Sequence, residues 1–353
     1  MLKDAALALS LANLCFIQTW LSLLDYTKNF PSYYQYVAAL LSVGLLALLF
    51  WVAVRLARRS RSATAWQAAR LAFPLALLIP LEGILLLLLS GHRRVIELTL
   101  VIVAVALILL SDSQRWSRVI VRGAATITLM LFPFVLITFT QSAWAISSFS
   151  EGHTAFPPGD SNSSGNRVVW MIFDEMDYQI AFSTRPATLD LPEFDRLRRE
   201  SIFATNAYPP ADETSLSMPA LITGKKISRI AQVNPSQILI TYTGSDKAVN
   251  WNGEPSIFSR ANEAGFSTAL AGWYLPYCGV LGSSLNDCGV RNTSGGSLRR
   301  SMIKQVLVLI DTMPFGSILA RRFGMLQYIT QHTTLSMYRD IVANAQNMAV
   351  NPD

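Results

Sequence analysis

Long hydrophobic stretches fill the first 145 residues of the chain, and a different pattern follows them. Most of these stretches reach the roughly 20 residues that a helix needs to cross about 30 Å of hydrocarbon. The fourth is the shortest and carries Glu97 near one end. The pattern predicts a lipid-embedded domain over residues 1–146, with five membrane helices at residues 5–24, 35–56, 71–90, 95–110 and 123–143.

The pattern changes after the last of these stretches. Residues 147–166 are rich in Ser, Gly, Pro and Asn without hydrophobic periodicity, which predicts a linker. Beyond it, short apolar runs alternate with helical patterns, which is typical of a mostly parallel sheet with helices on both faces. We therefore expect an α/β domain over residues 167–353, with strands at 168–173, 238–242 and 267–271 and helices at 193–200, 215–222 and 256–264.

Composition and charge agree with a membrane protein. Hydrophobic residues make up 51% of the chain and charged residues 15%, which is too apolar for an ordinary soluble protein of this length. With the amino terminus in the cytoplasm, nine Lys and Arg residues fall on the cytoplasmic side and three, Lys28, Arg93 and Arg94, on the other. This asymmetry predicts a multi-pass inner or plasma membrane protein whose carboxyl-terminal domain is extracytoplasmic. The basic pI of 9.3 then reflects orientation, and since nucleic-acid-binding motifs are missing, no nucleic-acid partner is expected.

Acidic and hydroxyl residues stand at two informative places after the linker. Asp174 and Glu175 directly follow the apolar run 168–173, and Thr214 precedes a predicted helix. Carboxylates at the end of a buried strand and a hydroxyl at a helix start are the components of a metal-assisted nucleophilic site. A helix N-cap is the simpler interpretation of Thr214 alone, and Ser215 or Ser217 could take the cap instead.

The order and spacing of these motifs over residues 167–274 resemble the opening of the sulfatase-like branch of the alkaline phosphatase superfamily. In that family, metal-binding acids end the first strand and a Pro-x-x-Asp-x-Leu helix follows, here residues 192–197. The family's nucleophile lies ten residues before the Gly of a Leu-x-Thr-Gly turn, and counting back from Gly224 gives Thr214. The resemblance implies an alkaline-phosphatase-like α/β domain in which Asp174, Glu175 and Thr214 bind a divalent metal ion. It also implies that Thr214 is the catalytic nucleophile, while Glu175 departs from the Asp of typical sulfatases.

Other departures from the family narrow the expected function. Classical sulfatases convert the first residue of Cys-x-Pro-x-Arg into an aldehyde, but Thr214, Leu216 and Met218 occupy the fixed positions here. Threonine cannot be converted, and a threonine nucleophile behind several spans resembles the membrane-anchored phosphoglycerol and phosphoethanolamine transferases. The resemblance therefore implies hydrolysis or transfer of phosphate esters, in preference to sulfate esters, on an envelope lipid or glycan. Residues 272–274 also differ, because many sulfatases have a Lys and a His there.

The remaining metal ligands of the family are not found. The family completes its site with an Asp-His pair and further His residues from the second half of the domain, whereas the histidines here are His92, His153 and His332. We therefore expect the chain to hold only the amino-terminal half of the catalytic domain. The alternative function is a non-catalytic membrane protein that retains the fold. Zinc, manganese, magnesium and calcium all suit the oxygen donors, so the metal stays open.

Two further features of the sequence are informative. Cys278 and Cys288 lie ten positions apart across a Gly- and Ser-containing loop on the extracytoplasmic side, which predicts a disulfide, with two unpaired thiols as the alternative. Glu82, inside the third predicted span, is an intramembrane acid and thus a candidate functional residue. A polar neighbour such as Gln18 or Gln141 could equally satisfy it.

Overall fold

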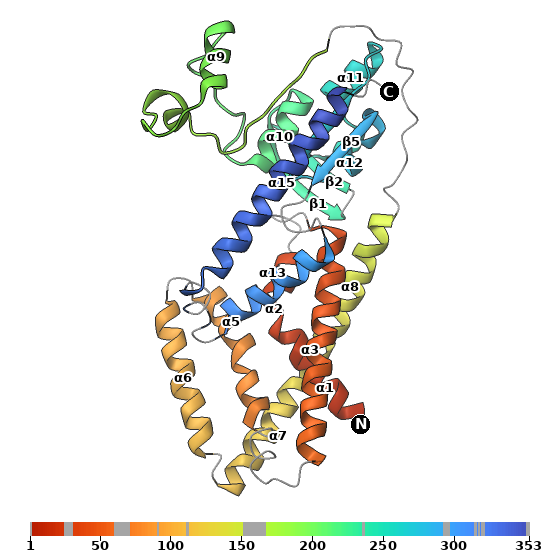
Figure 1. Cartoon of the computed structure of the whole chain (residues 1–353). Helices are drawn as coiled ribbons and strands as arrows, with labels where there is room; N and C mark the ends of the chain where they lie inside the picture. The colour runs from red at the N-terminus through yellow and green to blue at the C-terminus, as the bar shows by residue number, and fades with distance from the viewer. Residues whose placement is uncertain are drawn as a thin grey trace.

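The chain folds into a lower bundle of long helices and an upper part that contains both sheets (Figure 1). The computed structural model describes residues 2–24, 31–59, 71–89, 92–110, 113–150, 167–234, 237–291, 297–313, 316, 318 and 322–350. Most of the predicted linker, residues 151–166, lies outside these described residues.

The lower bundle is built from the apolar stretches of the first 150 residues. Its helices are α1 Leu2–Cys15, α2 Ile17–Leu24, α3 Tyr33–Arg59, α5 Leu78–Leu88, α6 Arg93–Leu110, α7 Gln114–Met130 and α8 Phe132–Ser150. By length and composition, three stretches of the described residues could cross a membrane: Tyr33–Leu56, Leu71–Leu88 and Arg115–Ser148. The bent pair Lys3–Cys15 and Ile17–Leu24, with 64° between its helices, adds a fourth if it is counted as one span.

The helix α6 is not among these candidates, although it matches the predicted span 95–110. It begins with Arg93 and Arg94 and carries Glu97, so its 18 residues include three charges. The number of five membrane spans and the orientation of the chain therefore stay predictions.

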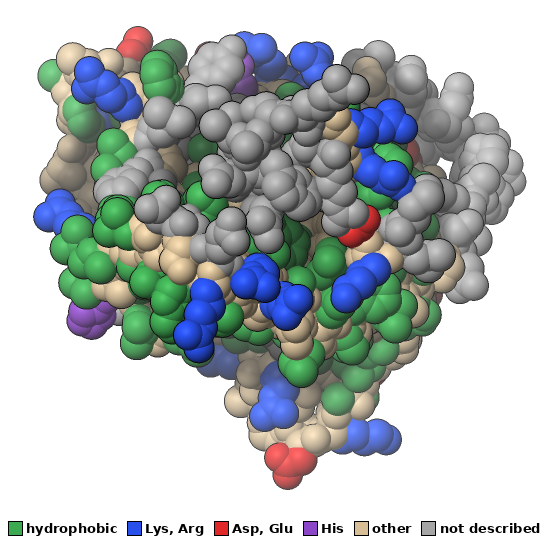
Figure 2. Space-filling model, turned by 90° about the horizontal axis from the view of Figure 1, so that it is seen from below, with side chains coloured by type: hydrophobic (Ala, Val, Ile, Leu, Met, Phe, Trp, Pro, Cys, Tyr) green, Lys and Arg blue, Asp and Glu red, His purple; other side chains and the backbone are tan. Residues whose placement is uncertain are grey.

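Many large side chains on the outer surface of the bundle are apolar and exposed. Trp20, Tyr36 and Val43 are fully buried between the helices, whereas Leu49 and Leu109 are 65% and 71% exposed. From below, Lys and Arg side chains lie scattered among hydrophobic ones (Figure 2). Exposed apolar surface of this extent is typical of helices that face lipid rather than water.

The upper part contains five short strands in two sheets. The strands are β1 Ile227–Asn234, β2 Gln237–Tyr242, β3 Ala248–Asn250, β4 Ala269–Trp273 and β5 Asp287–Arg291. The first three form an antiparallel sheet in the order β1-β2-β3, and β4 pairs with β5 in parallel. The prediction of a mostly parallel sheet is therefore wrong for the described residues. Only two residues separate β1 from β2, and so short a connection permits only antiparallel pairing.

The helices of the upper part largely follow the sequence pattern. They are α9 Pro192–Glu200, α10 Thr214–Thr223, α11 Ile257–Glu263, α12 Tyr277–Leu281, α13 Leu298–Asp311 and α15 Met325–Val350. Ser256 caps α11 by accepting a hydrogen bond from the Ser259 amide at 3.0 Å. Ile238, Ile240, Trp251 and Val280 form the fully buried centre of the core that joins the antiparallel sheet to α12.

The predicted strand at residues 168–173 is not formed. These residues carry no helix or strand, and Val168 and Val169 are 93% and 73% exposed. A strand needs hydrogen-bonding partners for its backbone, and none of the described strands pairs with this run. An apolar pattern alone therefore did not produce a strand here.

Two helices of the upper part reach down toward the bundle. The helix α13 packs on α3, where Gln305 hydrogen-bonds to Ser42 at 3.1 Å and to the Gln35 carbonyl at 2.9 Å, and Leu309 joins the core of the bundle. The helix α15 extends from the upper end of the bundle along β4 and β5 (Figure 1).

Candidate functional site

The amino terminus of α10 supplies the hydroxyl side of the site. Thr214 is the first residue of this helix, and Glu213 stands at the cap position with an extended backbone. The Glu213 carbonyl accepts the amides of Leu216 at 3.1 Å and Ser217 at 2.8 Å. The N-cap interpretation of Thr214, Ser215 and Ser217 is therefore wrong, since all three lie inside the helix.

The helix α10 ends at Gly224, the glycine from which ten residues were counted back to Thr214. Gly224 adopts a left-handed backbone conformation with φ of 72°, and its amide donates to the Ala220 carbonyl at 2.9 Å. A residue with a β-carbon is strained in this conformation, so glycine is favoured there.

Asp174 meets Thr214 although forty positions separate them in sequence. The Thr214 Oγ1 donates a hydrogen bond to Asp174 Oδ1 at 3.3 Å, and both residues are half-buried. Glu175 is exposed, and its φ of 58° lies in the left-handed region. The structure thus brings together two of the three predicted site residues, and the third follows directly in the chain with a strained backbone.

Tyr274 completes this group, and sequence reasoning did not select it. It follows the last residue of β4 and hydrogen-bonds with Ser215 on α10. Burial, and next the negative charges of Glu213 and Asp174, raise the pKa of its phenol. The available signal was its position at the carboxyl end of a predicted strand, where ligand-binding residues concentrate.

Backbone strain also marks this place. Among the described residues, the non-glycine residues with positive φ are Glu175, at 58°, and Tyr274, at 81°. Both belong to the group around Thr214. Such residues cost about 1–3 kcal/mol each and cluster at functional sites, because only tight surroundings maintain them.

The residues that follow Tyr274 are anchored by a buried ring and by a disulfide. The ring of Tyr277 is buried against Trp251, with 6.3 Å between the ring centroids in an edge-to-face arrangement. Burial raises the pKa of the Tyr277 phenol, and the charge of Asp174 acts in the same direction. A disulfide joins Cys278 on α12 to Cys288 on β5, with 5.7 Å between the Cα atoms. The segment after Tyr274 is thus fixed both by the packing of Tyr277 and by the disulfide of Cys278.

A metal ion fits this group only in part. The carboxylates of Asp174 and Glu175 and the hydroxyl of Thr214 are hard oxygen donors, which suit a divalent cation. Among the residues that the structure describes, however, no three His, Cys, Asp or Glu side chains are grouped to hold a metal. The described residues therefore offer hard oxygen donors, but too few of them to hold a divalent cation on their own.

Comparisons of the chain with models of protein families, with curated proteins and with solved structures return no match.

Proposed function

We propose that this chain is a membrane-anchored enzyme of the sulfatase-like type that hydrolyses or transfers phosphate esters of envelope lipids or glycans. The observation that carries the proposal is the 3.3 Å hydrogen bond from Thr214 Oγ1 to Asp174 Oδ1 at the start of α10. A hydroxyl aimed at a carboxylate, at a helix amino terminus, has the arrangement of an activated oxygen nucleophile. The proposal places this region outside the cytoplasm, supported by the asymmetry of Lys and Arg in the sequence.

In this proposal Thr214 attacks phosphorus. A bond forms between Thr214 Oγ1 and phosphorus, the hydroxyl proton passes to Asp174, and the bond from phosphorus to the leaving alkoxide breaks as that alkoxide takes a proton from solvent water. Water or an acceptor alcohol, having given a proton to the solvent, then attacks phosphorus, the bond from phosphorus to Thr214 Oγ1 breaks, and this oxygen recovers its proton from Asp174. The first amides of α10 and its dipole favour the negative charge that the phosphoryl oxygens carry in these steps.

Tyr274 supplies a neutral donor on the opposite side. A tyrosine phenol is protonated at neutral pH, and burial and the nearby carboxylates raise its pKa further. It would donate to a phosphoryl oxygen where many sulfatases use cationic side chains. A divalent cation remains the cofactor in this proposal, with Asp174, Glu175 and Thr214 as its ligands from this part of the chain.

The test compares three proteins in detergent with divalent cations. They are the 353-residue chain, the product of the whole open reading frame that encodes it, and that product with Thr214→Ala. We expect phosphodiester turnover by the whole product to fall by about 10⁴-fold when the nucleophile is removed. Turnover of an aryl sulfate should stay low throughout, because Thr214 cannot become an aldehyde.

Two further variants sharpen this test. Ser217→Ala removes a hydroxyl from the same helix that bonds to the Ala211 carbonyl at 2.7 Å, and it should leave turnover nearly unchanged. Tyr274→Phe should lower kcat/KM by about 10–100-fold, the loss of one hydrogen bond to a charged group. Full activity of Thr214→Ala would remove Thr214 from the mechanism. An inactive whole product would favour the non-catalytic alternative.

A further inference from the structure

A buried carboxyl group lies in the membrane bundle, far from the site above in sequence. Glu82 on α5 is fully buried, and neither of its carboxylate oxygens has a hydrogen-bond partner among the described residues. Gln18, a neighbour that could have satisfied it, instead donates to the Gly83 carbonyl at 2.6 Å. An ionised carboxylate buried without partners is strongly unfavourable. The group must therefore carry something that neutralises its charge.

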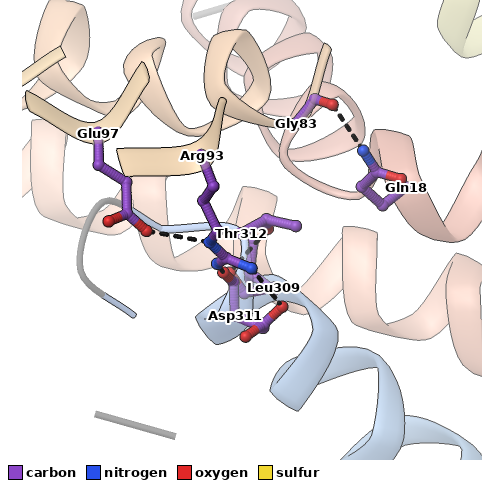
Figure 3. A network of polar contacts seen from close by, with 7 residues as sticks. All are labelled: Gln18, Gly83, Arg93, Glu97, Leu309, Asp311 and Thr312. Atoms are coloured by element: carbon purple, nitrogen blue, oxygen red, sulfur yellow. Dashed lines mark hydrogen bonds and ion pairs between the residues drawn. The ribbon is translucent and has the colours of Figure 1, made fainter. Parts of the chain in front are cut away.

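The nearest cation is already used by other acids (Figure 3). Arg93 donates from Nε to Glu97 at 3.0 Å and from Nη1 to the Asp311 carboxylate at 3.4 Å. Its Nη2 atom also donates to the Asp311 backbone carbonyl. One guanidinium thus serves two carboxylates before Glu82 is counted.

The charged groups around Glu82 come from two elements. Arg93 and Glu97 on α6 and Asp311 on α13 lie within electrostatic range of it, and α2 contributes the neutral Gln18. Three acids therefore share one base, and two of them, Glu82 and Glu97, are buried. The described residues hold no cluster of three acids, His or Cys arranged for a metal ion. A proton is the cation that neutralises a lone carboxyl group without further ligands.

We propose that Glu82 is a proton-binding site inside the membrane bundle, coupled to the Arg93 and Asp311 ion pair. While Glu82 holds its proton, Arg93 stays with Glu97 and Asp311. When the proton leaves, a third carboxylate competes for Arg93, and the link to Asp311 weakens. Because Asp311 is the last residue of α13, the protonation of Glu82 controls how firmly α13 is held to the bundle.

The first test is infrared spectroscopy of the full chain in lipid nanodiscs at neutral pH. We expect a carbonyl stretch from a protonated carboxylic acid that shifts when Glu, but not Asp, is labelled with ¹³C. Glu82→Gln should abolish this band, while Glu200→Gln, a matched change at an exposed acid of α9, should leave it. If Glu82→Gln does not fold, Glu82→Asp should make the band respond to labelled Asp instead.

The second test follows α13 by amide hydrogen exchange across the neutral pH range. Native Glu82 binds a proton that the unfolded chain has lost, so stability should fall as pH rises through the native titration. Exchange in α13, corrected for its intrinsic pH dependence, should rise with pH in the wild type and stay flat in Glu82→Gln. If the wild-type protein shows no infrared band from a protonated Glu, Glu82 is not a proton-binding site. If the band is present but amide exchange in α13 does not change with pH, the coupling between Glu82 and α13 is refuted.

Discussion

Two largely apolar runs of equal length behave in opposite ways. Residues 237–242 form β2, with Ile238 and Ile240 fully buried between β1 and β3. Residues 168–173 form no strand, and Val168 is 93% exposed. The difference lies in the partners, because β2 has a strand hydrogen-bonded on each side. A hydrophobic pattern reports that a run can be buried, and neighbouring strands decide whether it is.

The candidate site joins these two regions. Thr214 and Tyr274 belong to the packed region with a buried core, whereas Asp174 directly follows the unpaired run. The packed region therefore positions Thr214 and Tyr274. Asp174 comes from a segment that does not belong to this core.

The largest contrast should appear in stability. Trp251→Ala removes a fully buried side chain from the packed core, which should lower the free energy of unfolding by about 3–5 kcal/mol. Val169→Ala, at an exposed position of the unpaired run, should change it by less than about 0.5 kcal/mol. Chemical denaturation of the two variants in detergent measures both. Comparable losses would mean that the run 168–173 is packed in solution.

The disulfide should contribute the next largest effect. Replacing Cys278 and Cys288 together by Ser should destabilise the packed region by about 3 kcal/mol in the chain-entropy account. Mass spectrometry of non-reduced peptides should find the two residues linked. Alkylation of both thiols without prior reduction would contradict the pairing.

The smallest effect belongs to an ion pair beside the unpaired run. Arg185 hydrogen-bonds to both carboxylate oxygens of Asp195 on α9 at 2.7 Å, and this lowers the Asp195 pKa. A depressed native pKa means that the stabilisation is present above the unfolded value of about 3.9 and is lost as pH falls below it. Amide exchange of α9, corrected for its intrinsic pH dependence, should therefore rise slightly in acid. Asp195→Asn should show the faster exchange already at neutral pH and no further rise in acid, and identical pH profiles would discount the pair.

Elements whose ends are marked by particular residues were predicted most accurately. The helices α9, α10 and α11 were predicted to within two residues, because Pro192, Gly224 and Ser256 mark their ends. The antiparallel sheet was missed because β1 alternates weakly, with polar residues such as Ser228, Arg229 and Gln232.

The site was predictable in part for the same reason. Spacing along the chain pointed to Asp174 and Thr214, and the structure places them in contact. For Tyr274 the sequence offered only a place shortly after a predicted strand, because its contact with Ser215 on α10 depends on the tertiary fold. Glu82 was visible as an intramembrane acid, but only the structure shows Gln18 turned to another acceptor.

The docking of α13 has a consequence for biosynthesis. Ser42 and Gln35 on α3 leave the ribosome some 260 residues before Gln305, their hydrogen-bond partner on α13. The early helices therefore emerge with this surface uncovered, and only later synthesis covers it. A fragment that starts at residue 167 would carry α13 without its binding surface and should aggregate, so the outer region is best produced together with the helices that precede it.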